Sequence, residues 1–130
     1  MRAELKGVHP VLSASDVTAS VQFYCNLGFT LLFQDTAEGP SYAGVARDNV
    51  EVHIQWADAQ RWGYPTDRPS YRFMVSDVDA IYREFVESGR IDTNARKGSP
   101  WASPADTPWG TREFHVRDPG NNILQFYRPL

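Results

Sequence analysis

The 130-residue chain contains one cysteine, Cys25, so no disulfide can form within it. No apolar run approaches the roughly 18 residues that a membrane-spanning helix needs, and the first ten residues, MRAELKGVHP, lack the apolar centre of a signal peptide. Basic residues are not in excess, because 13 Lys and Arg stand against 16 Asp and Glu for a net charge of −3. We therefore expect a single cytoplasmic domain with no nucleic-acid or membrane partner.

Aromatic residues, in contrast, are abundant: four Trp, six Tyr and seven Phe make up 13% of the chain. Several are difficult to place in one small core, and some lie beside Pro or Gly: Phe33, Tyr42, Trp56, Trp62, Tyr64, Tyr71, Trp101 and Trp109. Exposed aromatic clusters mark binding surfaces, and flat rings stack on flat ligands and attract cations. The aromatic residues therefore indicate a site for a planar small molecule, although packing in the core or between subunits is the other interpretation for the tryptophans.

Two segments with helical spacing of apolar residues organise the chain. Residues 17–26 follow a cap at Ser15 or Asp16 and end before Gly28. Residues 78–88 follow Ser76-Asp77 and end at Gly89. Strands are expected at residues 8–13, 30–33, 42–46, 50–56, 70–75, 111–117 and 122–127, and near 91–95.

A shift of 61 residues relates the two halves, since it carries Asp16 onto Asp77 and Gly28 onto Gly89. A cap, an apolar stripe and a stop recur at equal spacing, which predicts a tandem βαβββ repeat in an α+β fold. Unit one spans about residues 7–56, a linker about 57–69 and unit two about 70–128, all within a single domain of residues 1–130. Two such units bury their sheets together and leave a cleft.

Two sets of short motifs carry a family resemblance. They are Ser15-Asp16-Val17, Val21-Gln22-Phe23-Tyr24 and Leu27-Gly28-Phe29 in the first half, and Trp109-Gly110, Arg112, Phe114 and Asp118-Pro119-Gly120-Asn121-Asn122 in the second. The chain thereby resembles the vicinal-oxygen-chelate superfamily of glyoxalases, bleomycin-resistance proteins and dioxygenases, and most of all the bleomycin-resistance proteins. The resemblance implies a cupped mixed sheet around a cleft, and a homodimer that often exchanges an N-terminal strand.

The resemblance also implies four metal-ligand positions, which fall on His9, His53, Ser70 and Gln125. Neutral imidazoles bind divalent transition metals well, whereas a serine hydroxyl is a poor ligand and Gln125 replaces the carboxylate of the enzymes. One interpretation is therefore a divalent ion such as Zn, Ni, Fe or Mn on His9, His53 and Gln125. The other is that no cofactor binds and that the histidines line the cleft.

The position of the drug groove in the bleomycin-resistance proteins supplies most of the expected ligand contacts. These contacts are Phe33, Tyr42, His53, Gln55, Arg72, Trp101 and Trp109. Arg72 stands where that branch has an aromatic residue, so it either favours an anionic ligand or pairs with Glu51. Three residues outside this set have plainer interpretations: Glu51 as a solvated charge or an anion at the cleft mouth, His115 as a half-exposed strand histidine, and Cys25 as a buried thiol.

The leading functional hypothesis is a non-enzymatic protein that sequesters a bleomycin-type antibiotic, with no catalytic residue. Resistance would then follow from stoichiometric capture. A metal-dependent glyoxalase- or dioxygenase-like enzyme is the alternative. Capture of an unrelated metabolite is the third hypothesis.

Overall fold

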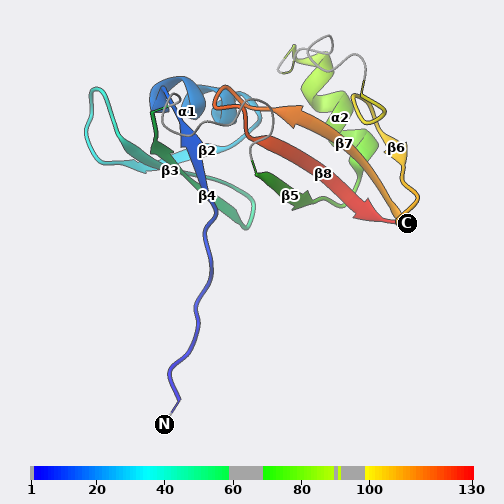
Figure 1. Cartoon of the computed structure of the whole chain (residues 1–130), viewed down its shortest axis with the longest axis horizontal. Helices are drawn as coiled ribbons and strands as arrows, with labels where there is room; N and C mark the ends of the chain where they lie inside the picture. Colours follow the sequence, from blue (N-terminus) through cyan, green and yellow to red (C-terminus); the bar gives the residue numbers. More distant parts are fainter. Residues whose placement is uncertain (1, 59–68, 90, 92–98) are drawn as a thin grey trace.

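The computed structural model describes residues 2–58, 69–89, 91 and 99–130. Two four-stranded sheets lie side by side, each with one helix (Figure 1). The elements are β1 Val11–Ala14, α1 Val17–Asn26, β2 Thr30–Gln34, β3 Tyr42–Arg47, β4 Val50–Trp56, β5 Ser70–Met74, α2 Val78–Glu87, β6 Ala105–Asp106, β7 Thr111–Arg117 and β8 Ile123–Pro129. The strand orders are β1-β4-β3-β2 and β5-β8-β7-β6.

The sheet pairing confirms the tandem βαβββ repeat. In each sheet the first strand pairs in parallel with the last, Val11 lying opposite His53 and Arg72 opposite Gln125. The remaining strands pair antiparallel. Val11 and Arg72 differ by the same 61 residues that relate the two halves of the sequence. The predicted α+β fold is therefore correct.

An aspartate caps the N-terminus of each helix. Asp16 accepts a hydrogen bond from the amide of Ala19, and Asp77 accepts one from Ala80, so each carboxylate satisfies a donor of the first turn. Beyond α1, Gly28 adopts a φ of 94°, which L side chains rarely reach. Cys25, predicted to be buried, is intermediate in exposure because it lies at the side of the α1 stripe.

The core lies between each sheet and its helix. Alternate strand residues point inward, and they are Leu12, Ala14, Ala43, Val45, Val52 and Ile54 in the first sheet and Phe73, Phe114, Val116, Leu124 and Phe126 in the second. The predicted alternation in β4 holds only at its centre: Val50 and Trp56, at the strand ends, are 39% and 52% exposed. Because successive side chains alternate, the residues between these core positions face away from the helices.

The two repeat units are joined by buried polar contacts. The Tyr24 hydroxyl on α1 donates to Asp118 Oδ2 at 2.6 Å, and Asn122 Nδ2 donates to Asp118 and, at 2.9 Å, to the carbonyl of Ser13. Burial raises the pKa of Asp118, although these hydrogen bonds act to lower it. The contacts hold β1 beside the turn before β8.

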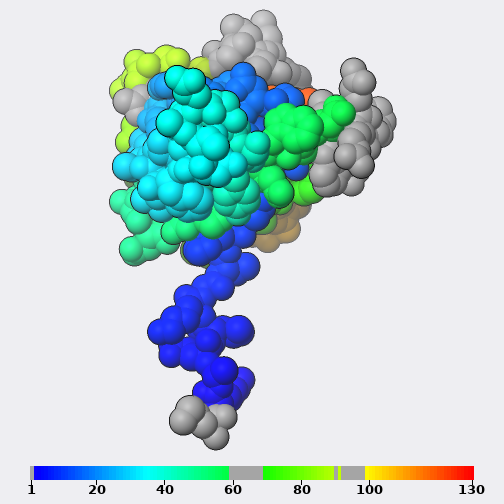
Figure 2. All heavy atoms as spheres, turned by 90° about the vertical axis from the view of Figure 1, so that its left-hand side faces the viewer, coloured from blue at the N-terminus to red at the C-terminus, as the bar shows by residue number. Residues whose placement is uncertain are grey.

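Several segments differ from the prediction or lie outside the described residues. The expected strand of residues 8–13 begins only at Val11, because residues 2–10 form an N-terminal arm that contacts β4 at His9 and Pro10 and extends away from the sheets before them (Figures 1 and 2). Ala105–Asp106 forms a short strand that is not among the strands expected from the sequence. The expected strand near 91–95 and the linker at 57–69 lie mostly outside the described residues. None of the helices in the described segments is long and apolar enough to span a membrane.

Candidate functional site

The outward sides of the two sheets carry the predicted site residues. We call His9, Phe33, Tyr42, Glu51, His53 and Gln55 the first polar face, and Arg72, Trp101, Trp109, Glu113, His115 and Gln125 the second polar face. The first belongs to the arm and to β2, β3 and β4. The second belongs to β5, β7, β8 and the loop before β7.

Aromatic rings gather on the first polar face. The Phe33 ring stacks beside Tyr42 at 6.1 Å between centroids and meets His53 edge-on at 5.2 Å. Gly44, which lies opposite His53, leaves space for the Phe33 ring, because a Cβ at this position would lie 2.3 Å from Phe33 Cε1. The structure thus brings three of the predicted ligand contacts into one cluster.

Polar contacts on the same face centre on Glu51. Its Oε2 lies 2.7 Å from His53 Nε2 and 3.6 Å from His9 Nε2, and the two imidazole rings are 4.7 Å apart. The other nitrogen of His53, Nδ1, lies 2.7 Å from the Tyr42 hydroxyl. Glu51 is therefore neither a simple solvated charge nor a partner of Arg72.

The second polar face holds a closed ion network around Glu113. Arg72 Nη2 donates to Glu113 Oε2 at 3.2 Å, and Arg72 Nη1 donates to Gln125 Oε1 at 2.7 Å. The Arg72 guanidinium also lies 4.0 Å above the Tyr127 ring. The predicted pairing of Arg72 with Glu51 is therefore wrong, because the carboxylate beside Arg72 is that of Glu113.

Glu113 is fully buried, with two further partners. The Thr111 hydroxyl donates to its Oε2 at 2.6 Å, and His115 Nε2 lies 2.8 Å from its Oε1. Burial raises the pKa of Glu113, but the hydrogen bonds from Thr111, His115 and Arg72 outweigh burial and hold that pKa below its usual value. The expectation of a half-exposed His115 is wrong, because its side chain is only 9% exposed beside Glu113.

Two tryptophans continue this face. Trp101 stacks on His115 at 5.4 Å and 28°, and the tilted Trp109 ring follows at 5.3 Å. A backbone hydrogen bond from His115 to the Trp101 carbonyl holds the loop against β7. Trp109 at the end is 57% exposed, so a ring surface remains open for stacking.

The predicted metal set is divided between the faces. His9 and His53 belong to the first, whereas Gln125 on the second accepts its hydrogen bond from the Arg72 cation. A guanidinium beside a neutral amide oxygen repels a metal ion, and Ser70 adds only an exposed hydroxyl. The superfamily's arrangement of metal ligands from both repeat units therefore does not fit these residues.

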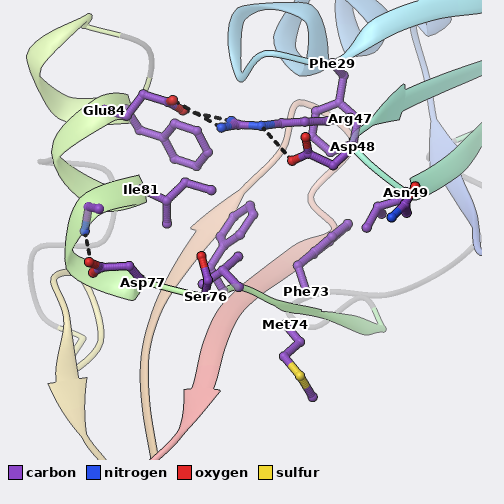
Figure 3. Close-up of a pocket in the computed structure, with 15 residues that line it drawn as sticks. Phe29, Arg47, Asp48, Asn49, Phe73, Met74, Ser76, Asp77, Ile81 and Glu84 are labelled. Atoms are coloured by element: carbon purple, nitrogen blue, oxygen red, sulfur yellow. Dashed lines mark hydrogen bonds and ion pairs between the residues drawn. The ribbon is translucent and has the colours of Figure 1, made fainter.

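A cavity of about 430 Å³ lies on the helix side, away from both polar faces. Its apolar wall includes Phe29, Phe73 and Ile81, and Arg47 spans it to form two hydrogen bonds with Glu84 on α2 (Figure 3). None of the predicted site residues lines this cavity.

Sequence reasoning missed Glu113, the centre of the second network. The strings Glu51-Val52-His53 and Glu113-Phe114-His115 share one spacing, which places the carboxylate and the imidazole of each string on the same side of a strand. That repetition could have identified Glu113. Its partner Arg72, 41 residues earlier, required the tertiary structure.

Comparisons with known proteins agree with the fold. The sequence profile of the Glyoxalase/Bleomycin resistance protein/Dioxygenase superfamily matches residues 7–126. The bleomycin resistance protein of Geobacillus stearothermophilus is 26% identical over 93% of this chain and 95% of its own length.

Two solved structures are also similar. The bleomycin-binding protein of bleomycin-producing Streptomyces verticillus, in complex with copper(II)-bleomycin, is 30% identical over 96% of this chain and 97% of its own, with a TM-score of 0.70. The bleomycin resistance determinant of transposon Tn5 is 18% identical over 96% and 98%, with a TM-score of 0.75.

Proposed function

Because the chain belongs to the glyoxalase/bleomycin resistance protein/dioxygenase superfamily, we propose that it captures a bleomycin-type antibiotic in the cytoplasm and makes or breaks no bond in it. The observation that carries the proposal is the stack of His115, Trp101 and Trp109, which ends in an exposed indole. A planar aromatic group extends this stack, and its burial supplies affinity without chemistry.

The charges of the two faces suit a cationic ligand. Arg72 donates to Glu113 and Gln125 and lies over Tyr127, so its positive charge is compensated within the protein. On the first face, the Glu51 carboxylate is 31% exposed beside two imidazoles. With the net charge of −3, this favours a cation over an anion.

We also propose that the active form is a homodimer. Leu5 and Val8 on the N-terminal arm are 97% and 88% exposed. A second copy would cover these apolar side chains, and each polar face would then meet a face of the other chain. Sedimentation velocity tests this: a dimer is expected for the full chain, and a monomer for a variant without residues 2–8.

A fluorescence titration tests the capture proposal. Tag-free protein treated with EDTA is titrated with metal-free bleomycin and, separately, with copper(II)-bleomycin, while tryptophan emission is recorded. We expect saturable quenching with a Kd below about 1 μM, or −8 kcal/mol, at one drug per chain. Recovery of chemically unchanged drug by mass spectrometry shows that no bond was altered. Absence of quenching up to about 100 μM drug would overturn the proposal.

A further inference from the structure

On the first polar face, His9, Glu51 and His53 converge within one repeat unit. One ligand atom from each, an imidazole nitrogen or a carboxylate oxygen, lies within 4.8 Å of the other two. Two ligands of a single transition-metal ion at ordinary bond lengths stand about 3–4 Å apart. Glu51 Oε2 already lies 3.6 Å from Nε2 of the half-exposed His9 on the arm, and its 2.7 Å contact with His53 Nε2 must lengthen by less than about 1 Å for an ion to enter.

We propose that His9, Glu51 and His53 form a binding site for one divalent first-row transition-metal ion, such as zinc or copper(II). Two neutral imidazoles and one carboxylate are ligands that these ions prefer, and three protein ligands leave further positions for water. The site uses no residue of the second repeat unit. It therefore differs from the set of His9, His53 and Gln125 that the sequence predicts.

Tyr42 prepares His53 for this role. A metal ion on Nε2 of a neutral imidazole requires the proton on Nδ1, and that nitrogen lies 2.7 Å from the Tyr42 hydroxyl, whose oxygen can accept it. The Phe33 ring borders the imidazole at 5.2 Å. Both neighbours restrict the ring to the orientation in which Nε2 faces Glu51.

Burial and charge also suit a cation. The side chains of His53 and Glu51 are 14% and 31% exposed, so the pair is partly shielded from water yet still accessible to an ion. The site carries one negative charge, and Arg72 is held by Glu113 rather than by Glu51. The peptide N–H of His53 donates to the Pro10 carbonyl at 2.9 Å, which keeps the end of the arm against β4. A bound ion would add a second attachment through His9.

Direct metal titration tests the site without any drug. Tag-free, EDTA-treated protein is titrated with Zn²⁺ by calorimetry and with Cu²⁺ by electron paramagnetic resonance. We expect one ion per chain with a Kd of about 1 μM or tighter, and a Cu²⁺ spectrum with two nitrogen ligands. His9→Gln and Glu51→Gln should each weaken binding by more than about tenfold, and His9→Gln should leave one nitrogen in the spectrum.

One control variant and one variant of a neighbouring residue separate this site from general surface binding. Glu38→Gln removes an exposed carboxylate elsewhere and should leave the affinity unchanged. Tyr42→Phe keeps all three ligands but removes the contact with Nδ1, so it should weaken binding about tenfold. Circular dichroism confirms that each variant is folded. A Kd weaker than about 100 μM, or an affinity that His9→Gln and Glu51→Gln leave unchanged, would overturn the proposal. Drug capture can succeed or fail independently, since its titration with metal-free bleomycin uses EDTA-treated protein and involves no metal ion.

Discussion

The two polar faces contain the same local unit in different surroundings. Each has a glutamate and a histidine two residues apart on one strand, with contacts of 2.7 Å between Glu51 and His53 and 2.8 Å between Glu113 and His115. The third partner differs. His9 completes the first unit, whereas Arg72 completes the second. The charge of that third side chain decides whether the unit can accept a cation or already contains one.

The two glutamates also differ in how deeply they are buried. The Glu51 side chain is 31% exposed, whereas that of Glu113 is 1% exposed. A buried carboxylate requires compensation by a cation and hydrogen bonds, and Glu113 has both. We conclude that the second face is built for rigidity and supports the tryptophan stack, while the first remains open.

The largest expected effect comes from removing the buried charge. Glu113→Gln leaves Arg72 without its carboxylate and should lower the free energy of unfolding by about 2–3 kcal/mol. This loss is smaller than for a fully buried ion pair, because water can still solvate the partly exposed Arg72. Glu51→Gln, at the partly exposed pair, should cost less than about 1 kcal/mol. Urea denaturation of both variants measures the difference. Equal losses would show that the two faces are not energetically distinct.

The next effect concerns ligand affinity. Trp109→Ala removes the exposed end of the stack and should weaken bleomycin binding about ten- to thirtyfold, or about 1.4–2 kcal/mol. Trp56→Ala is the matched control, because Trp56 is similarly exposed, at 52% against 57%, but lies outside the stack. Binding is measured by calorimetry, since both variants change the fluorescence. A similar loss in both variants would argue against stacking on Trp109.

Much of the fold could be predicted from local patterns. The aspartate caps, Gly28 and the equal spacing of the halves identify both helices, because capping and positive φ depend on neighbouring residues. The strand Ala105–Asp106 could not be predicted, because two residues are too few to show a periodic pattern. The exposure of Trp56 was not predicted for a related reason. Alternation shows which side chains of β4 share a face, but it does not show how far along the strand the core covers that face.

The candidate site could be predicted only in part. Phe33, Tyr42 and His53 were expected together, and the structure clusters them. The partner of Arg72 could not be predicted, because β5, β7 and β8 become neighbours only when the sheet forms. The burial of His115 likewise depends on Trp101, which reaches it from a loop without a repeating pattern.

A smaller effect on affinity tests how the first face is packed. Gly44→Ala places a Cβ against the Phe33 ring, which must move away from β3, and should weaken bleomycin binding about fivefold. Gly7→Ala, where a Cβ would meet no atom within 4 Å, is the control. The same calorimetric titration measures both variants. An unchanged affinity in Gly44→Ala would exclude the Phe33 position from the binding surface.

The smallest effect is the pH dependence of the Glu113 network. The pKa of Glu113 is lower in the folded protein than its ordinary value of 4.5, so the folded state binds fewer protons through this group than the unfolded state. Its stabilising contribution is therefore complete above pH 4.5 and is lost as the pH falls through the folded pKa. The stability gap between wild type and Glu113→Gln should narrow as the pH falls below 4.5. Asp118, whose pKa is raised by burial, has the opposite pH dependence, but it is present in both proteins and its contribution cancels in the stability gap.

Urea midpoints along the pH series measure the stability gap between wild type and Glu113→Gln. If it widened toward acid, the network would hold the protonated form of Glu113 and the contrast between the faces would have another cause.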